Sequence, residues 1–168
     1  TKGKHHIFTF DHKEKQDADG TQHRTLQSIL DKTTLLIGHN LQHDLQWLWG
    51  CGFKYEQEVY DTMLAEYILQ RGLKKSVSLA ACAERYELDY DKQDTLKEYF
   101  TLSLHDALPI FVTKALYEKL EQEYAKPDSA SLMNVRNISN NVCKTLTRVY
   151  INGFKIDKHA LTKVRDEF

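Results

Sequence analysis

Asn40 and Asp44 are two polar residues whose types and spacing point to chemistry. They lie in the stretch "LIGHNLQHDLQWL", where an apolar run meets an amide and a carboxylate. If a strand ends at Gly38 and a helix begins near Asn40, both side chains lie on one face of that helix. The apolar stripe of the same helix consists of Leu41, Leu45 and Leu48. The carboxylate of Asp44 is therefore expected to point away from the core.

The position of Asn40 and Asp44 after a strand favours a binding site. In open α/β sheets, ligands bind in the crevice beyond the carboxyl ends of the strands, which is where both residues are expected. From spacing alone, a purely structural interpretation is equally open. In that interpretation Asn40 caps the helix, and Asp44 is a solvated acid favoured by the helix dipole.

Three further features surround this pair. Asp61, in "EVYDTMLAEYIL", is expected to cap the next helix. His39 and His43 are four residues apart, but no Glu follows the first histidine as in a metalloprotease, so a histidine metal site is weakly indicated. Trp47 and Trp49 are interpreted as core or interface anchors and not as base-stacking platforms.

The elements around these residues alternate between strand-like and helix-like patterns. The runs "HHIFTFDH" and "TTLLIG" are typical of strands, as is the short approach to Asp61. Helical apolar spacing marks "HRTLQSILDK", "SVSLAACAERYEL" and "FVTKALYEKLEQEYAK". The alternation predicts an α/β fold in which a small sheet is wrapped by helices.

The composition limits the classes of protein to consider. At 168 residues with 41% hydrophobic content, the chain can bury one ordinary core. Its net charge of -1 excludes a broad basic surface, so any nucleic-acid contact must be a local groove. The three cysteines lack C-x-x-C spacing, which disfavours disulfides and zinc. Neither a membrane-length apolar run nor a signal peptide is found, so a soluble, cytoplasmic protein with no membrane partner is expected.

Four blocks of the sequence carry a resemblance to a known family. They are, in order, "LIGHNLQHDLQWL", "YDTMLAEYIL", "KKSVSLAACAERYEL" and "VTKALYEKLEQEY". Together they resemble the proofreading 3′-5′ exonuclease domain of family A, polymerase I-like DNA polymerases, particularly phage forms, over most of residues 5–125. The resemblance implies a DEDD exonuclease with a ribonuclease-H-like mixed sheet flanked by helices. It also implies the cytoplasm of a bacterial cell, with a phage gene as one source.

A later segment resembles the start of a polymerase domain. This segment, "NVCKTLTRVYINGFKIDKHALTKV", looks like the helix, Asn-Gly turn and helix that follow the exonuclease in this family. We therefore expect an exonuclease-like domain at residues 1–126 and the start of a polymerase domain, as a C-terminal helical extension, at residues 127–168. The chain would then be an internal slice of a longer polymerase.

The resemblance assigns roles at the strand-to-helix junction. The family removes nucleotides from single-stranded 3′ ends of DNA with two divalent cations, and carboxylate oxygens suit Mg²⁺ or Mn²⁺. By resemblance, Asp44 is the catalytic and metal-binding carboxylate of the second motif. Asn40 and His43 occupy positions near the substrate strand, although a plain surface role for His43 is equally open. His39 and Asp61 are expected to support the site, Asp61 as a cap and orienter.

The first motif of the family, Asp-x-Glu, is absent from the sequence. Thr1 is expected to follow it, so the fold is expected to be N-terminally truncated and to lack its first strand or strands. Asp11 and Glu14 cannot replace the motif, because a strand would direct carboxylates at this spacing to opposite faces.

The third motif, Tyr-x-x-x-Asp, should precede "VTKALYEKL", but the sequence there reads "TLSLHDALPI", residues 101–110. This decamer is identical to one translated frame of a common sequencing adapter, ACTCTTTCCCTACACGACGCTCTTCCGATC. We interpret it as an assembly artefact that displaced the genuine motif, so His105 and Asp106 carry little weight as a catalytic pair. Pro109 falls where the family has its Asp, and it is expected to disturb the helix.

The leading interpretation is a proofreading exonuclease domain whose 168-residue polypeptide is inactive or nearly so, because Asp44 alone remains of the expected carboxylates. One alternative is a non-catalytic module that keeps the fold as a scaffold within a polymerase. Another is an RNA-processing exonuclease of the ribonuclease D type. The segment "YINGFKID" disfavours the latter, since it resembles a polymerase and not an RNA-binding helical domain.

Overall fold

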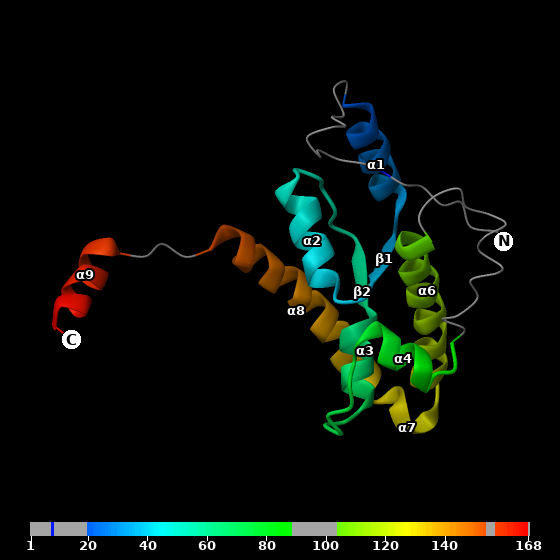
Figure 1. Ribbon diagram of the computed structural model, residues 1–168. Coiled ribbons are helices and arrows are strands. Elements are labelled where there is room, and N and C mark those ends of the chain that lie inside the picture. Colours follow the sequence, from blue (N-terminus) through cyan, green and yellow to red (C-terminus); the bar gives the residue numbers. More distant parts are fainter. Residues whose placement is uncertain (1–7, 9–19, 89–103, 154–156, 168) are drawn as a thin grey trace.

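The computed structural model describes residues 8, 20–88, 104–153 and 157–167 (Figure 1). The elements are α1 (Thr21–Lys32), β1 (Leu35–Gly38), α2 (Leu41–Gly50), β2 (Glu58–Asp61), α3 (Thr62–Leu69), α4 (Leu79–Arg85), α6 (Leu104–Tyr124), α7 (Pro127–Ala130), α8 (Leu132–Asn152) and α9 (Lys158–Glu167). Apart from Phe8, the expected strand "HHIFTFDH" lies outside the described residues, and so do Asp11 and Glu14.

The two described strands form a parallel pair. β1 and β2 run in register from Leu35 opposite Glu58 to Gly38 opposite Asp61, and α2 connects them. A strand, a helix and a parallel strand form the unit expected of an α/β fold, because parallel strands need a crossover connection. A mixed sheet would require an antiparallel strand, and the two strands seen in the described ranges are parallel.

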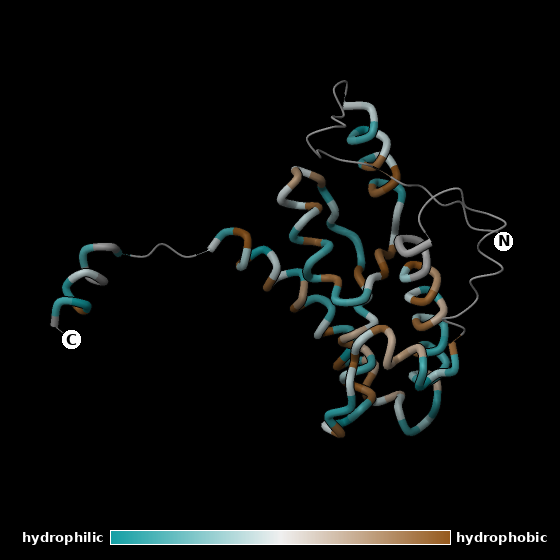
Figure 2. The backbone as a smooth tube through the Cα atoms, in the orientation of Figure 1, coloured by the Kyte–Doolittle hydropathy of each residue, from teal (hydrophilic) through white to brown (hydrophobic). Residues whose placement is uncertain are grey.

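Two apolar clusters pack on the two sides of the strands. In Figure 1, α2 lies on one side and α6 lies on the other. The first cluster comprises Leu30, Leu41, Leu45, Leu48, Phe53, Tyr55 and Val59. The second cluster comprises Tyr60, Ala65, Cys82, Leu116, Leu120 and Tyr124. The apolar stripes predicted for α2 and α6 are therefore buried, and their brown positions recur along both helices in Figure 2.

Helix α8 packs against α2, α3 and β2. Its Arg136 pairs with Glu121 of α6 and places its guanidinium 4.9 Å from the ring centre of Tyr60 and 4.7 Å from that of Tyr124. Packing therefore continues past residue 126, where the sequence suggested a domain boundary. That boundary stays a prediction. Helix α9 lies apart from the strands, beyond the end of α8 (Figure 1).

Helix α6 contains Pro109 and continues to Tyr124, so this proline does not end the helix. A proline removes one backbone hydrogen bond from a helix. The burial of Val112, Leu116 and Leu120 against the core provides the opposing stabilisation.

The three cysteines are free thiols: Cys51 is exposed, whereas Cys82 and Cys143 are buried. Burial raises the pKa of Cys82 to about 11, which keeps this thiol protonated near neutral pH. Within the described parts of the chain, no helix is long and apolar enough to cross a membrane.

Replacing Leu45 by Ala should lower the free energy of unfolding by about 2–5 kcal/mol, because Leu45 is 0% exposed and its loss leaves a cavity. Leu146→Ala is the matched control, since Leu146 of α8 is 54% exposed and should change stability by less than about 0.5 kcal/mol. Urea unfolding followed by circular dichroism measures both changes. Equal losses in the two variants would contradict this description of the core.

Candidate functional site

The carboxyl ends of β1 and β2 lie side by side, and a helix follows each of them closely. Gly38 pairs with Asp61 across the sheet, α2 begins at Leu41, and α3 begins at Thr62. The N-termini of two helices therefore meet at one edge of the sheet. Their backbone N–H groups and dipoles favour negative charge at this edge.

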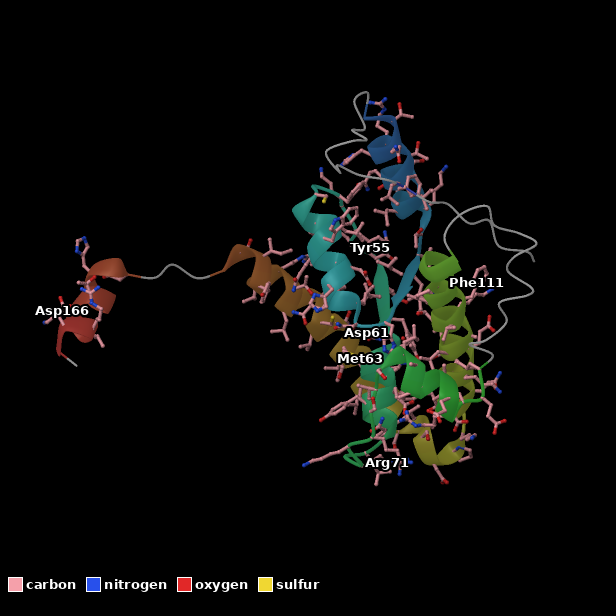
Figure 3. The ribbon with its side chains drawn as sticks, viewed as in Figure 1. Tyr55, Asp61, Met63, Arg71, Phe111 and Asp166 are labelled. Atoms are coloured by element: carbon pink, nitrogen blue, oxygen red, sulfur yellow. The ribbon has the colours of Figure 1, made fainter. Side chains whose placement is uncertain are left out.

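The side chain of Asp61 binds both helix starts. Its Oδ1 accepts hydrogen bonds from the backbone N–H groups of Asn40 (3.0 Å), Met63 (2.9 Å) and Leu64 (3.4 Å). Its Oδ2 accepts one from Leu41 (2.9 Å). Figure 3 shows Asp61 and Met63 together at the end of β2. Asp61 is 1% exposed and caps α3 as the sequence predicted, but it also fixes the start of α2.

Asn40 has a left-handed backbone conformation, with φ 63° and ψ 48°. Asn tolerates this region better than most residues do. Its side chain makes no capping hydrogen bond to α2, so the interpretation of Asn40 as a side-chain cap is wrong. Asp61, at the end of β2, caps the start of α2 instead. The side-chain amide of Asn40 takes no part in capping this helix.

Asp44 lies in the first turn of α2, and its carboxylate lies against the end of β1. A Cβ atom at Gly38 would lie 3.2 Å from Asp44 Oδ2 and 2.5 Å from Leu41 Cδ1, so a glycine permits this close approach. Desolvation, and then the negative charge of Asp61, raise the pKa of Asp44 above its ordinary value of 3.8, while His43 opposes the shift. This carboxylate therefore lies in a locally negative environment.

A cavity of about 410 Å³ opens beside Asp44. It lies between the end of β1, α2, the start of α4 and α6. Its lining residues are Ile37, Gly38, His39, Asp44, Leu79, Pro109, Ile110, Thr113 and Lys114. The structure thus brings Asp44 and Pro109 to one cavity, although 65 positions separate them in the sequence. Asn40 does not line this cavity; it lines a separate groove of about 290 Å³ with Asp61.

His39 is fixed by a short chain of hydrogen bonds. The Thr62 hydroxyl donates to the Gly38 carbonyl oxygen (3.0 Å), so the Nδ1–H of His39 donates to Thr62 Oγ1 (2.9 Å). Burial lowers the pKa of His39 below its ordinary value of 6.5, although Asp61 and the Val77 carbonyl partly oppose the shift. His39 therefore supports the junction as a neutral side chain.

His43 is exposed on α2 beside Asp44. Within the described ranges, no group of three or more His, Cys, Asp or Glu side chains is arranged to hold a metal ion. His39 and His43 therefore do not form part of such a group. Among the described residues that line the cavity, Asp44 is the one carboxylate. The oxygens of Asp61 accept backbone hydrogen bonds instead.

Over residues 2–143, the chain matches the model of the 3′-5′ exonuclease domain of the DNA polymerase A family. The chain belongs to this 3′-5′ exonuclease family. No curated protein and no solved structure gives a significant match. The exonuclease part of the resemblance is therefore confirmed. The match includes the decamer at residues 101–110 and extends into α8.

Some residues of the candidate site have no local signal in the sequence. Asn140 of α8 accepts a hydrogen bond from the backbone N–H of Asp61 (3.2 Å) across 79 positions of the chain. Thr62 and Gly38 could have been noticed as neighbours of the strand ends, but their bond to each other depends on the register of the sheet. Trp47, expected to anchor the core or an interface, is exposed.

Asp61→Asn should lower the free energy of unfolding by about 1–3 kcal/mol, because an amide nitrogen cannot accept a hydrogen bond from a backbone N–H. Asp44→Asn is the matched control: Asp44 is exposed and its ionised form is disfavoured, so this variant should be neutral or slightly stabilising. Chemical unfolding at neutral pH measures both. An unchanged midpoint for Asp61→Asn would show that these hydrogen bonds contribute little.

His39 should make stability depend on pH. Its pKa is lowered on folding, so its contribution is fully present above pH 6.5 and is lost as the pH falls through the folded pKa. Unfolding at about pH 7.5 and about pH 5.5 should show a smaller acid loss for His39→Gln than for the wild type. The exposed His43→Gln is the control and should behave as the wild type. The same acid loss in all three proteins would contradict the assignment.

Proposed function

We infer that this exonuclease domain removes nucleotides from single-stranded 3′ ends of DNA, as the proofreading part of a family A DNA polymerase. Family membership supports the reaction, and the parallel unit β1–α2–β2 is compatible with a ribonuclease-H-like sheet. In this proposal Asp44 is the catalytic and metal-binding carboxylate. Asn40 and His43 contact the 3′-terminal nucleotide.

The observation that carries the proposal is the shared cavity of Asp44 and Pro109. The resemblance places the third-motif Asp of the family at position 109, and this position opens onto the same cavity as the second-motif carboxylate. Two remote positions that the family needs together are therefore neighbours here. Lys114, which also lines the cavity, provides a positive charge for a phosphate group.

Two-metal hydrolysis with Mg²⁺ or Mn²⁺ requires several carboxylates around the scissile phosphate. The described residues that line the cavity include one carboxylate, so they do not fit a two-metal site, and no catalytic step is assigned through metals. What the chain provides is positioning. Asp61 fixes the start of α2, which orients Asn40 and Asp44, while His39 and Thr62 connect the two strand ends.

We also propose that the remainder of the polymerase domain, beyond its start at residues 127–168, covers α8. An apolar row is exposed along this helix and consists of Val135, Ile138, Val142, Leu146 and Val149. Exposed apolar rows of this kind mark interaction surfaces. The resemblance of residues 141–164, which begin within α8, to a polymerase start indicates the partner.

Pro109→Asp should add a second carboxylate to the cavity and increase the affinity for Mn²⁺ by roughly tenfold or more, because ligand charge count sets affinity at such sites. Pro109→Asn is the control without the charge, and Pro109→Asp combined with Asp44→Asn is the control without the partner. The electron paramagnetic resonance signal of free Mn²⁺ measures binding. Equal affinity in Pro109→Asp and Pro109→Asn would contradict the assignment of position 109.

The 168-residue polypeptide itself should hydrolyse a 5′-labelled single strand no faster than its Asp44→Ala variant, because the carboxylate set is incomplete. Gel separation of the products in Mn²⁺ measures this. Clear hydrolysis that depends on Asp44 would contradict the expected inactivity. Resequencing the source DNA across residues 95–115 then separates the two remaining interpretations. A Tyr-x-x-x-Asp there supports the exonuclease, whereas a genuine decamer supports the non-catalytic module.

A further inference from the structure

We propose that Trp47 is a stacking platform for a base of the single-stranded substrate, on the 5′ side of the nucleotide that is removed. This inference rests on the proposed function for the direction of the strand. It also changes the interpretation of Trp47, which the sequence alone suggested to be a core or interface anchor.

Trp47 lies on the outward face of α2 that carries the candidate site residues. Asp44 and Trp47 both lie within α2 and are three residues apart, so they are neighbours on one side of the helix, whereas Asn40 precedes the helix. Trp47 is 46% exposed, whereas the next residue, Leu48, is buried. A large aromatic surface therefore adjoins Asp44 on its own helix face.

The position of Trp47 along α2 matches the direction of the strand. In the proposed function, Asn40 contacts the 3′-terminal nucleotide and Asp44 lies at the scissile phosphate. Trp47 lies about 4.5 Å further along the helix axis, on the side of Asp44 away from Asn40. Stacked nucleotides rise by about 3.4 Å, so a strand that runs along α2 would bring the first base on the 5′ side of the bond that breaks to the indole.

The indole of Trp47 packs against a second aromatic ring. Its ring stacks on Phe53, with centroids 6.0 Å apart and an interplanar angle of 26°. Phe53 in turn stacks on His23 of α1 at 4.1 Å and 15°. Phe53 is buried, so one ring supports Trp47 while much of the indole surface faces solvent. A platform that is already ordered loses little conformational entropy when a base stacks on it.

Stacking also suits the charge of the chain. The net charge is -1, so a broad basic surface cannot supply the affinity for DNA. Aromatic stacking needs no such surface and is tolerant of sequence, because every base has a flat face. That tolerance is what an enzyme needs if it removes any nucleotide from a 3′ end.

Trp49 is a natural control, because it has another role. The Arg148 guanidinium of α8 lies 5.1 Å from its ring centre, and Trp49 is partly buried against the first apolar cluster. Its indole therefore contributes to the contact between α2 and α8. These are the two tryptophans of the chain, so each can be observed alone by replacing the other with Phe.

The test uses the full 168-residue chain and a fluorescein-labelled strand of about 15 thymidines, in EDTA so that no hydrolysis occurs. Trp47→Ala should weaken binding, measured by fluorescence anisotropy, about 5- to 100-fold, while Trp47→Phe keeps most of the affinity. A strand of the same length with abasic sites should bind the wild type more weakly. For Trp47→Ala, the abasic strand and the thymidine strand should bind with equal affinity.

Intrinsic fluorescence gives a second reading that does not depend on the stability of Trp47→Ala. In Trp49→Phe, the thymidine strand should quench Trp47, and in Trp47→Phe it should leave Trp49 unchanged. If the wild type binds the strand but Trp47→Ala binds equally well and Trp47 is not quenched, the stacking inference is overturned and the proposed function stands. If the wild type does not bind single-stranded DNA at all, both are overturned.

Discussion

The carboxylate of Asp61 is the interaction on which the rest of the site depends. It is buried at the end of β2 and accepts hydrogen bonds from backbone N–H groups at the starts of both α2 and α3. A buried charge is costly unless such donors surround it, and free helix N–H groups are costly unless an acceptor reaches them. One side chain satisfies both needs. These hydrogen bonds fix the backbone of Asn40 and the first turn of α2, which positions the side chain of Asp44.

The same carboxylate sets the electrostatics of the edge. Desolvation and the negative charge of Asp61 both raise the pKa of Asp44, so the two carboxylates repel each other at one end of the sheet. The two differ in their partners: the oxygens of Asp61 accept backbone hydrogen bonds, and the oxygens of Asp44 face a cavity. A cation in that cavity would relieve the repulsion by favouring the ionised form of Asp44. The acid that is exposed, and not the buried one, is therefore suited to bind a ligand.

Local patterns in the sequence predicted the elements well, because each depends on nearby residues. The stripe of α2, the cap at Asp61 and the change from strand to helix after Gly38 are all found in the structure. What the sequence could not predict depends on distant segments. Asn140 reaches Asp61 across 79 positions, and no periodicity reports that contact. Trp47 has the residue type of a core anchor, and its exposure depends on where Phe53 and α1 pack. Asn40 has the residue type of a cap, but Asp61 takes that role from the neighbouring strand.

Pro109 shows that the fold and the chemistry of this domain depend on different residues. Helix α6 is held by Val112, Leu116 and Leu120, which are buried with proline at position 109. Proline removes one backbone hydrogen bond from the helix, and the helix still extends through position 109 beside the cavity. The side chain at 109 then decides what the cavity contains. A carboxylate there would share the cavity with Asp44, and with a pyrrolidine ring Asp44 is the one carboxylate among the described lining residues. The buried contacts that hold α6 therefore do not include the side chain at position 109, and in the proposed function that position is where a carboxylate is needed.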